Sequence, residues 1–237
     1  MRALLPSPLA DVDVHEHYAA GWIDRGGLRV NMVSSLDGAG TVDGLSAGLQ
    51  TRGDNAVFAA LRDLADVVLV GARTAEGESY KPARPSGERL AARRRHGLGD
   101  ALPVALVSRS LRVDPSGPLF GDASTLLFTC AAASPPSRLG QAEVVVCGDD
   151  DLDPALMREA LRERGLTRVL CEGGPSLFAS LTAAGQVDEL CLSLTPILAG
   201  PGATRIVGGA PWQVARGGLQ LTGLLEEEDA LFLRLTA

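Results

Sequence analysis

Short apolar segments that alternate with helical patterns are the feature that most constrains this chain. The apolar segments are rich in valine and leucine and are bounded by turn residues; they span 66–71, 103–108, 124–128, 143–147 and 168–171. Helical patterns fall among them, at 54–63, 154–164 and 175–183. Wholly apolar strands are typical of parallel sheets that are covered on both faces. We therefore predict an α/β fold with a mixed, mainly parallel sheet and helices on both faces.

The two ends of the chain complete this pattern. Residues 28–34 alternate apolar and polar side chains as a half-buried strand does, and residues 187–195 predict another strand. Residues 219–225 and 230–235 flank four acidic residues and predict a C-terminal antiparallel hairpin. Residues 1–27 are rich in turn residues. We predict an N-terminal extension over 1–27 and one domain over 28–237.

Charge and composition argue against several functions. The net charge of −7 disfavours general nucleic-acid binding, because contacts to phosphates dominate that binding. No apolar stretch reaches the ~18 residues that a membrane span needs, and the N-terminus shows no secretory signal, so we expect a cytoplasmic protein without membrane contact. The four cysteines form no C-x-x-C pair and only three histidines occur, so we expect no metal site.

Ligands of open α/β sheets lie beyond the carboxyl ends of the strands, where four loops of this chain carry polar groups. These loops are 34–38, 71–76, 107–110 and 171–177. Each of the first three also has a plain structural interpretation, as a turn, a helix cap or a surface arginine. The basic segment 81–102 is interpreted as a loop and a solvated helix face rather than a binding patch.

The loop at 171–177 is the most specific of the four. Its sequence places a carboxylate and two glycines between a strand and a helix, whose first turn offers free amides to an anion. It does not match the G-x-G-x-x-G fingerprint. No G-x-S-x-G elbow or G-x-x-x-x-G-K-[ST] loop is present, which disfavours hydrolases and kinases.

The ordered set of motifs resembles the reductase domain of the riboflavin-biosynthesis deaminase-reductases, which has a dihydrofolate-reductase-like fold. The matching motifs are 30–38, 61–62 with 66–74, 172–177, and 187–190 with 195–200. The resemblance covers residue 28 to the C-terminus. The zinc-deaminase signature, H-x-E followed by P-C-x-x-C, is absent from the sequence, so no deamination is expected.

The resemblance implies NADPH-dependent reduction of the ribosyl group of a 5-amino-6-ribosylaminopyrimidine 5′-phosphate to ribityl. It implies cofactor contacts from Val33, Ser34, Gly71, Thr74, Ser108, Arg109, Gly173, Gly174, Pro175, Ser176 and Leu177. Ser108 and Arg109 would hold the 2′-phosphate of NADPH. Substrate groups would lie near Ser46, Arg62, Glu78 and Arg84, and either Asp37 or Glu172 would assist proton transfer.

Two alternatives remain open from the sequence. One is reduction of dihydrofolate or another pterin, and the other is a non-catalytic NADPH sensor. The resemblance also suggests a homodimer, in which residues 187–195 and the C-terminal hairpin form the interface.

Overall fold

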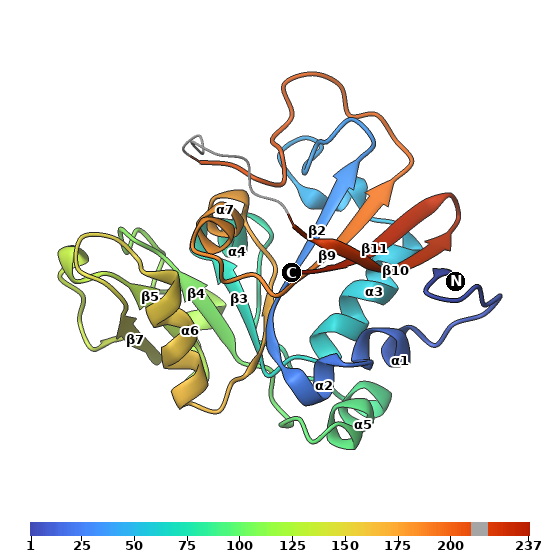
Figure 1. Ribbon diagram of the computed structural model, residues 1–237. Helices are drawn as coiled ribbons and strands as arrows, with labels where there is room; N and C mark the ends of the chain where they lie inside the picture. Colours follow the sequence, from blue (N-terminus) through green and yellow to red (C-terminus); the bar gives the residue numbers. More distant parts are fainter. Residues whose placement is uncertain (210–217) are drawn as a thin grey trace.

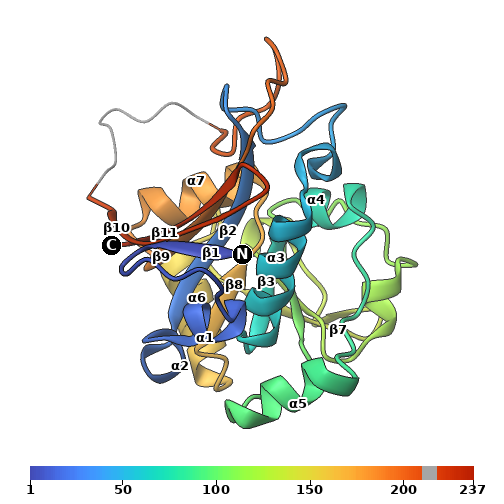
Figure 2. The same cartoon turned by 90° about the vertical axis from the view of Figure 1, so that its right-hand side faces the viewer.

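The computed structural model describes residues 1–209 and 218–237 and contains one eleven-stranded mixed sheet (Figures 1 and 2). From one edge to the other the strands are β1 (Arg2–Leu5), β10 (Gln220–Glu227), β11 (Ala230–Thr236), β9 (Glu189–Thr195), β2 (Gly27–Ser35), β8 (Arg168–Cys171), β3 (Val67–Gly71), β4 (Val104–Val107), β5 (Leu126–Thr129), β7 (Ala142–Val146) and β6 (Arg138–Leu139). The strands from β9 to β7 run parallel, and antiparallel strands border them on both sides. The predicted mainly parallel sheet and C-terminal hairpin are confirmed.

Helices cover both faces of the sheet, as the apolar strands predict. The helices are α1 (Val14–Ala19), α2 (Trp22–Arg25), α3 (Arg52–Asp63), α4 (Ala72–Gly77), α5 (Gly87–Arg95), α6 (Pro154–Glu163) and α7 (Pro175–Ala183). Leu28 and Val30 of β2 pack against α6 and α7, whereas Leu170 of β8 packs with α1, α2 and α3 on the other face. Figure 1 shows α6 and α7 together on one side of the sheet and α3 on the other.

Local signals explain where several elements begin and end. Asp153 caps α6, because its carboxylate accepts hydrogen bonds from the amides of Ala155 and Leu156, and Pro154 occupies the first turn. Thr51 caps α3 in the same way through the amide of Asp54. The short elements β1, α1, α2, α4 and β6 were not predicted.

The first 25 residues belong to the same packed structure as the rest. β1 pairs with the outer edge of β10, and Tyr18 of α1 and Trp22 of α2 are fully buried against α3 and the sheet. The predicted division of the chain at residue 27 stays a prediction. None of the helices in the described residues is both long enough and apolar enough to span a bilayer.

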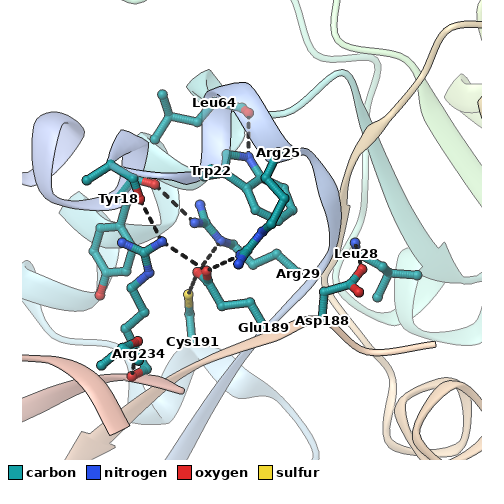
Figure 3. Close-up of polar contacts among 12 residues, drawn as sticks. Tyr18, Trp22, Arg25, Leu28, Arg29, Leu64, Asp188, Glu189, Cys191 and Arg234 are labelled. Atoms are coloured by element: carbon teal, nitrogen blue, oxygen red, sulfur yellow. Dashed lines mark hydrogen bonds and ion pairs between the residues drawn. The ribbon is translucent and has the colours of Figure 1, made fainter. Parts of the chain in front are cut away.

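A buried acid with three arginines ties the N-terminal helices to the sheet (Figure 3). Glu189 has no exposed surface, and its carboxylate lies 2.6 Å from Arg29 Nε, 3.0 Å from Arg234 and 3.4 Å from Arg25. Arg29 also stacks 4.0 Å from the centre of the Trp22 ring. Burial alone would raise the pKa of Glu189, but Arg29 and Arg234 outweigh it and lower the pKa.

The basic segment is only partly a solvated face, which corrects the sequence interpretation. Arg93 is fully buried, and its guanidinium donates hydrogen bonds to the backbone carbonyls of Arg62, Ala65, Gly99 and Ala101. The neighbouring Arg94 is exposed and pairs with Asp100, as a solvated face would predict. A run of arginines does not reveal which member meets carbonyls that the fold leaves without partners.

Candidate active site

The four polar loops of the sequence follow four strands that lie side by side. The strands β2, β8, β3 and β4 are neighbours in this order and run parallel. Their carboxyl ends therefore bring 34–38, 172–177, 71–76 and 108–110 to one edge of the sheet. A crevice at such an edge is the usual ligand site of an α/β fold.

The Gly173–Gly174 turn joins the ends of β8 and β3 through their backbones. The amide of Gly71 donates to the carbonyl of Gly173 over 2.8 Å, and Gly173 has a φ of +86° that favours glycine. A Cβ on Gly174 would overlap the hydroxyl of Thr74. The helix α7 begins directly after this turn without a side-chain cap, so its first amides lie at the candidate site.

Glu172 and Arg62 form the strongest polar pair at this edge. Arg62 Nε and Nη2 donate to the two carboxylate oxygens over 2.6 and 2.7 Å, and the hydroxyl of Tyr80 donates to Glu172 over 2.5 Å. The glutamate side chain is 3% exposed and the arginine side chain 21%. Burial alone would lower the pKa of Arg62, but the hydrogen bond and charge of Glu172 outweigh it and raise the pKa.

Two aromatic residues that the sequence reasoning missed fix this arginine. The guanidinium carbon of Arg62 lies 4.3 Å from the ring centre of Phe58 and 5.3 Å from that of Tyr80. Burial, followed by the charge of Glu172, raises the pKa of Tyr80. The hydroxyl therefore keeps its proton and acts as a donor. Phe58 stands four residues before Arg62, which is the spacing of contacting side chains on a helix.

Asp37 lies in the candidate site, but its carboxylate already accepts hydrogen bonds from other parts of the protein. Its carboxylate accepts a hydrogen bond from the Ser35 hydroxyl and others from the amides of Ala199 at 3.1 Å and Gly200 at 2.8 Å. The Ser35 hydrogen bond, followed by the two amides, lowers the pKa of Asp37 to about 2. The residue therefore stays ionised and holds the loop after β2 against the loop after β9.

The remaining predicted substrate residues fall into two groups. Ser46 and Glu78 lie together, because the amide of Ser46 donates to the Glu78 carboxylate over 2.9 Å. Arg84 instead pairs with Asp122 and is 62% exposed, so the structure does not join it to Arg62. Their roles in binding stay predictions.

The predicted phosphate-binding pair lies at the end of β4. Ser108 is buried, with its amide donating to the carbonyl of Phe128 over 3.0 Å. The Arg109 side chain is 67% exposed, and its ion pair with Asp151 is a loose one of 3.6 Å. Its guanidinium is thus accessible to an anion. The described residues contain no group of three potential metal-ligating side chains.

Comparisons with known proteins point to one family. A model of the RibD C-terminal domain family matches residues 27–226. A 2,5-diamino-6-ribosylamino-4(3H)-pyrimidinone 5′-phosphate reductase from Methanothermobacter thermautotrophicus is 29% identical over 180 residues, which cover 74% of each chain. A pyrimidine reductase-like protein from Corynebacterium diphtheriae has a similar structure, with a TM-score of 0.83, 25% identity, and 95% of this chain and 98% of that chain covered.

The fold recurs in a more distant protein. The riboflavin biosynthesis reductase Rib7 of Saccharomyces cerevisiae matches with a TM-score of 0.64 at 13% identity and covers 96% of this chain and 92% of its own. At that identity the likeness extends to the fold alone. It supports the predicted architecture, in which a mainly parallel sheet carries an antiparallel hairpin.

Proposed function

Because the chain belongs to the RibD C-terminal domain family, we propose that it reduces the ribosyl group of a 5-amino-6-ribosylaminopyrimidine 5′-phosphate to ribityl with NADPH. The observation that carries the proposal is the meeting of four polar loops at the ends of β2, β8, β3 and β4. The relative from Methanothermobacter thermautotrophicus is named for the 2,5-diamino-4(3H)-pyrimidinone form of this substrate. That form is therefore the first substrate to test.

The residues present at this edge suit a dinucleotide phosphate. The first amides of α7 and the exposed guanidinium of Arg109 are donors for anionic oxygens, and the absence of a Cβ at Gly174 lets the Thr74 hydroxyl lie against this turn. NADPH would supply a hydride at this site. The same cofactor site would be lined by Val33, Ser34, Gly71 and Thr74.

The chain's own contribution is to bind and orient the sugar phosphate. Arg62 keeps a fixed plane because Glu172 and two aromatic rings hold it, so it can orient an anion or a hydroxyl without losing much side-chain freedom. Glu172 can accept a hydrogen bond from a ribose hydroxyl beside that arginine. Ser46, Glu78 and Arg84 would complete the substrate contacts.

The test is a substrate panel with NADPH, followed through the absorbance of the reduced cofactor. We expect turnover of the diaminopyrimidinone ribosyl phosphate, and the uracil analogue shows whether the 2-amino group matters. Turnover of a dihydropterin alone would replace the proposal with a pterin reductase. Tight NADPH binding without turnover of any compound would indicate a sensor.

Arg109→Ala should weaken NADPH binding by about 10- to 100-fold and leave NADH binding nearly unchanged. The lost contact is a charge-assisted hydrogen bond to the 2′-phosphate, worth about 1.5–3 kcal/mol. Isothermal titration with both cofactors measures the difference. Arg138→Ala, at an exposed arginine of β6, is the matched control. Equal losses for the two cofactors would contradict the assignment.

Gly174→Ala should weaken NADPH binding by at least about 10-fold, since the added Cβ meets the Thr74 hydroxyl and displaces the start of α7. The expected cost of such overpacking is about 1–3 kcal/mol. Gly77→Ala is the control, because a Cβ there meets open space. Unchanged binding in Gly174→Ala would remove this turn from the cofactor site.

The proposal includes a homodimer in the cytoplasm. Leu219 and Leu221 beside and within β10 are 38% and 44% exposed, which supports an apolar contact on the C-terminal hairpin. Light scattering on the purified chain would measure the oligomeric state.

A further inference from the structure

The proposed reduction consumes one proton as well as one hydride. The sequence predicts that Asp37 or Glu172 assists the proton transfer, but both carboxylates already accept hydrogen bonds from the protein. Asp37 has a pKa of about 2 and is held by a hydroxyl and two amides. Both oxygens of Glu172 accept hydrogen bonds from Arg62, and Tyr80 donates a third. The contacts of Asp37 stabilise its ionised form, and the contacts of Glu172 engage both of its oxygens. A third carboxyl lies on the same face of the sheet.

Asp54 in the first turn of α3 is a buried carboxyl without an ion pair among the described residues. Its residue is 5% exposed, and its Oδ1 is buried without a hydrogen-bond partner in the described part of the chain. The side chain of Ser193 on β9 lies next to this carboxyl. A buried polar atom without a partner is rare in folded proteins and calls for a ligand or a function.

The sheet register places Ser193, the neighbour of Asp54, beside β2 of the candidate site. Ser193 pairs with Val33 of β2, which is one of the predicted cofactor contacts. The hydroxyl of Thr195 donates to the carbonyl of Leu49 over 2.6 Å. This hydrogen bond holds the segment before α3 against the end of β9. The acid therefore lies over the carboxyl-end half of β2 and β9.

A second unpartnered oxygen lies on the same face. Asn31 of β2 pairs with Cys191, and Cys191 and Leu170 pack with α3 in one cluster. Alternation along the strands puts Asn31 on this α3 side, at the level where Glu172 continues β8. Its Oδ1 is buried without a partner among the described residues. Asp54, Asn31 and Glu172 thus give the face under α3 a polar lining.

The surroundings of Asp54 favour its neutral form. Burial raises the pKa of this carboxyl above its ordinary value of 3.8, and only the Ser193 hydrogen bond opposes the shift. Among the packed elements, β10 contributes Glu227, which pairs with the chain's N-terminus, while Arg29 of β2 and Glu189 of β9 pair with each other. Burial and the unpartnered Oδ1 together favour a carboxyl that keeps its proton.

We propose that Asp54 is the proton donor of the reduction. This role rests on the proposed function. In the balanced step, C1′ of the ribosyl group takes the hydride and the bond from C1′ to the ring oxygen breaks. The electron pair of that bond stays on the ring oxygen, which takes the proton from Asp54. The dinucleotide is oxidised, and the Asp54 carboxylate regains a proton from solvent.

Asp54→Asn tests the proposal because asparagine keeps the shape of the side chain but has no acidic proton. We expect the single-turnover rate with NADPH and the diaminopyrimidinone substrate to fall by about 100-fold or more, the usual contribution of a general acid. The dissociation constant for NADPH should stay within about twofold, because the carboxyl does not hold the cofactor. The wild-type rate should fall at alkaline pH as Asp54 loses its proton. This fall should be absent from the pH profile of Asp54→Asn.

Asp63→Asn is the matched control at the other end of α3. Asp63 is as buried as Asp54 but pairs with Arg89 and His15, so this change should lower stability and leave the rate per folded molecule unchanged. A second measurement needs no turnover. Difference infrared spectra of the ligand-free protein should show a protonated carboxyl that persists above the ordinary aspartate range and is missing in Asp54→Asn.

The outcomes separate the two proposals. Absence of turnover in the wild type overturns the proposed function and the donor role with it, whereas the infrared band still reports the protonation of Asp54. Wild-type turnover with an unimpaired Asp54→Asn variant overturns the donor role alone. Wild-type turnover without a protonated Asp54 band does the same. Asp54→Glu, which restores an acid, should recover part of the rate.

Discussion

Glu172→Gln should remove most of the turnover, by about 100-fold or more, and also destabilise the fold. The change takes away the charge that holds Arg62 in its plane, and small misplacements of an orienting group cost rates of this size. It also leaves a largely buried guanidinium without its partner, which costs about 3–5 kcal/mol. Steady-state rates and urea unfolding measure the two effects. NADPH affinity should change little.

The matched control for this variant is Glu143→Gln. Glu143 pairs with Arg164 over 2.6 Å, but these side chains are 43% and 32% exposed, so the loss should stay below about 1 kcal/mol without an effect on turnover. If Glu172→Gln lost stability but kept its turnover per folded molecule, the pair would be structural only.

Glu189→Gln should produce a large loss of stability. The arginines around it come from α2, β2 and β11, and Arg29 is 1% exposed, so its charge cannot return to water without local unfolding. We expect the free energy of unfolding to fall by about 3–5 kcal/mol in urea titrations. Glu159→Gln, which breaks an exposed pair with Arg162, should leave the free energy of unfolding nearly unchanged. Similar losses in the two variants would contradict the structural role.

The same cluster predicts how stability depends on pH. The folded protein lowers the pKa of Glu189 from its ordinary value of 4.5, so the unfolded chain binds the proton more readily. The stabilisation is therefore present above the unfolded pKa and is lost as the pH falls through the folded pKa. In Glu189→Gln, the free energy of unfolding should therefore fall less steeply as the pH is lowered.

The strands and helices that the sequence predicts correctly are those with local signals. β3, β4 and β8 are short apolar runs, and α6 has an aspartate cap, a proline in its first turn and a glycine after its end. The N-terminal helices are short, and although Asp13 caps α1 through the amide of Glu16, Tyr18 and Trp22 are placed by contacts with residues far along the chain. The burial of Arg93 depends in the same way on distant carbonyls.

The candidate site shows the same division. Each strand-end loop can be found in the sequence, but the order β2, β8, β3 and β4 that brings the loops together depends on crossovers that no local pattern encodes. The partner choice of Arg62 and Arg84 also depends on that order. Asp54 went unnoticed because an aspartate after a helix cap has a common structural explanation, and only the packed structure reveals its unpartnered oxygen.

The strand β1 has a consequence for how copies of this chain can associate. An uncovered β10 would offer a row of unpaired backbone groups to any strand of another molecule. β1 covers this row from Leu224 to Glu226. β1 is itself short, pairs at Ala3 with Leu9, and is followed by Pro6 and Pro8. The sheet is thereby protected against growing from molecule to molecule on this side. Contacts between copies on this side would therefore rely on side chains rather than on backbone pairing.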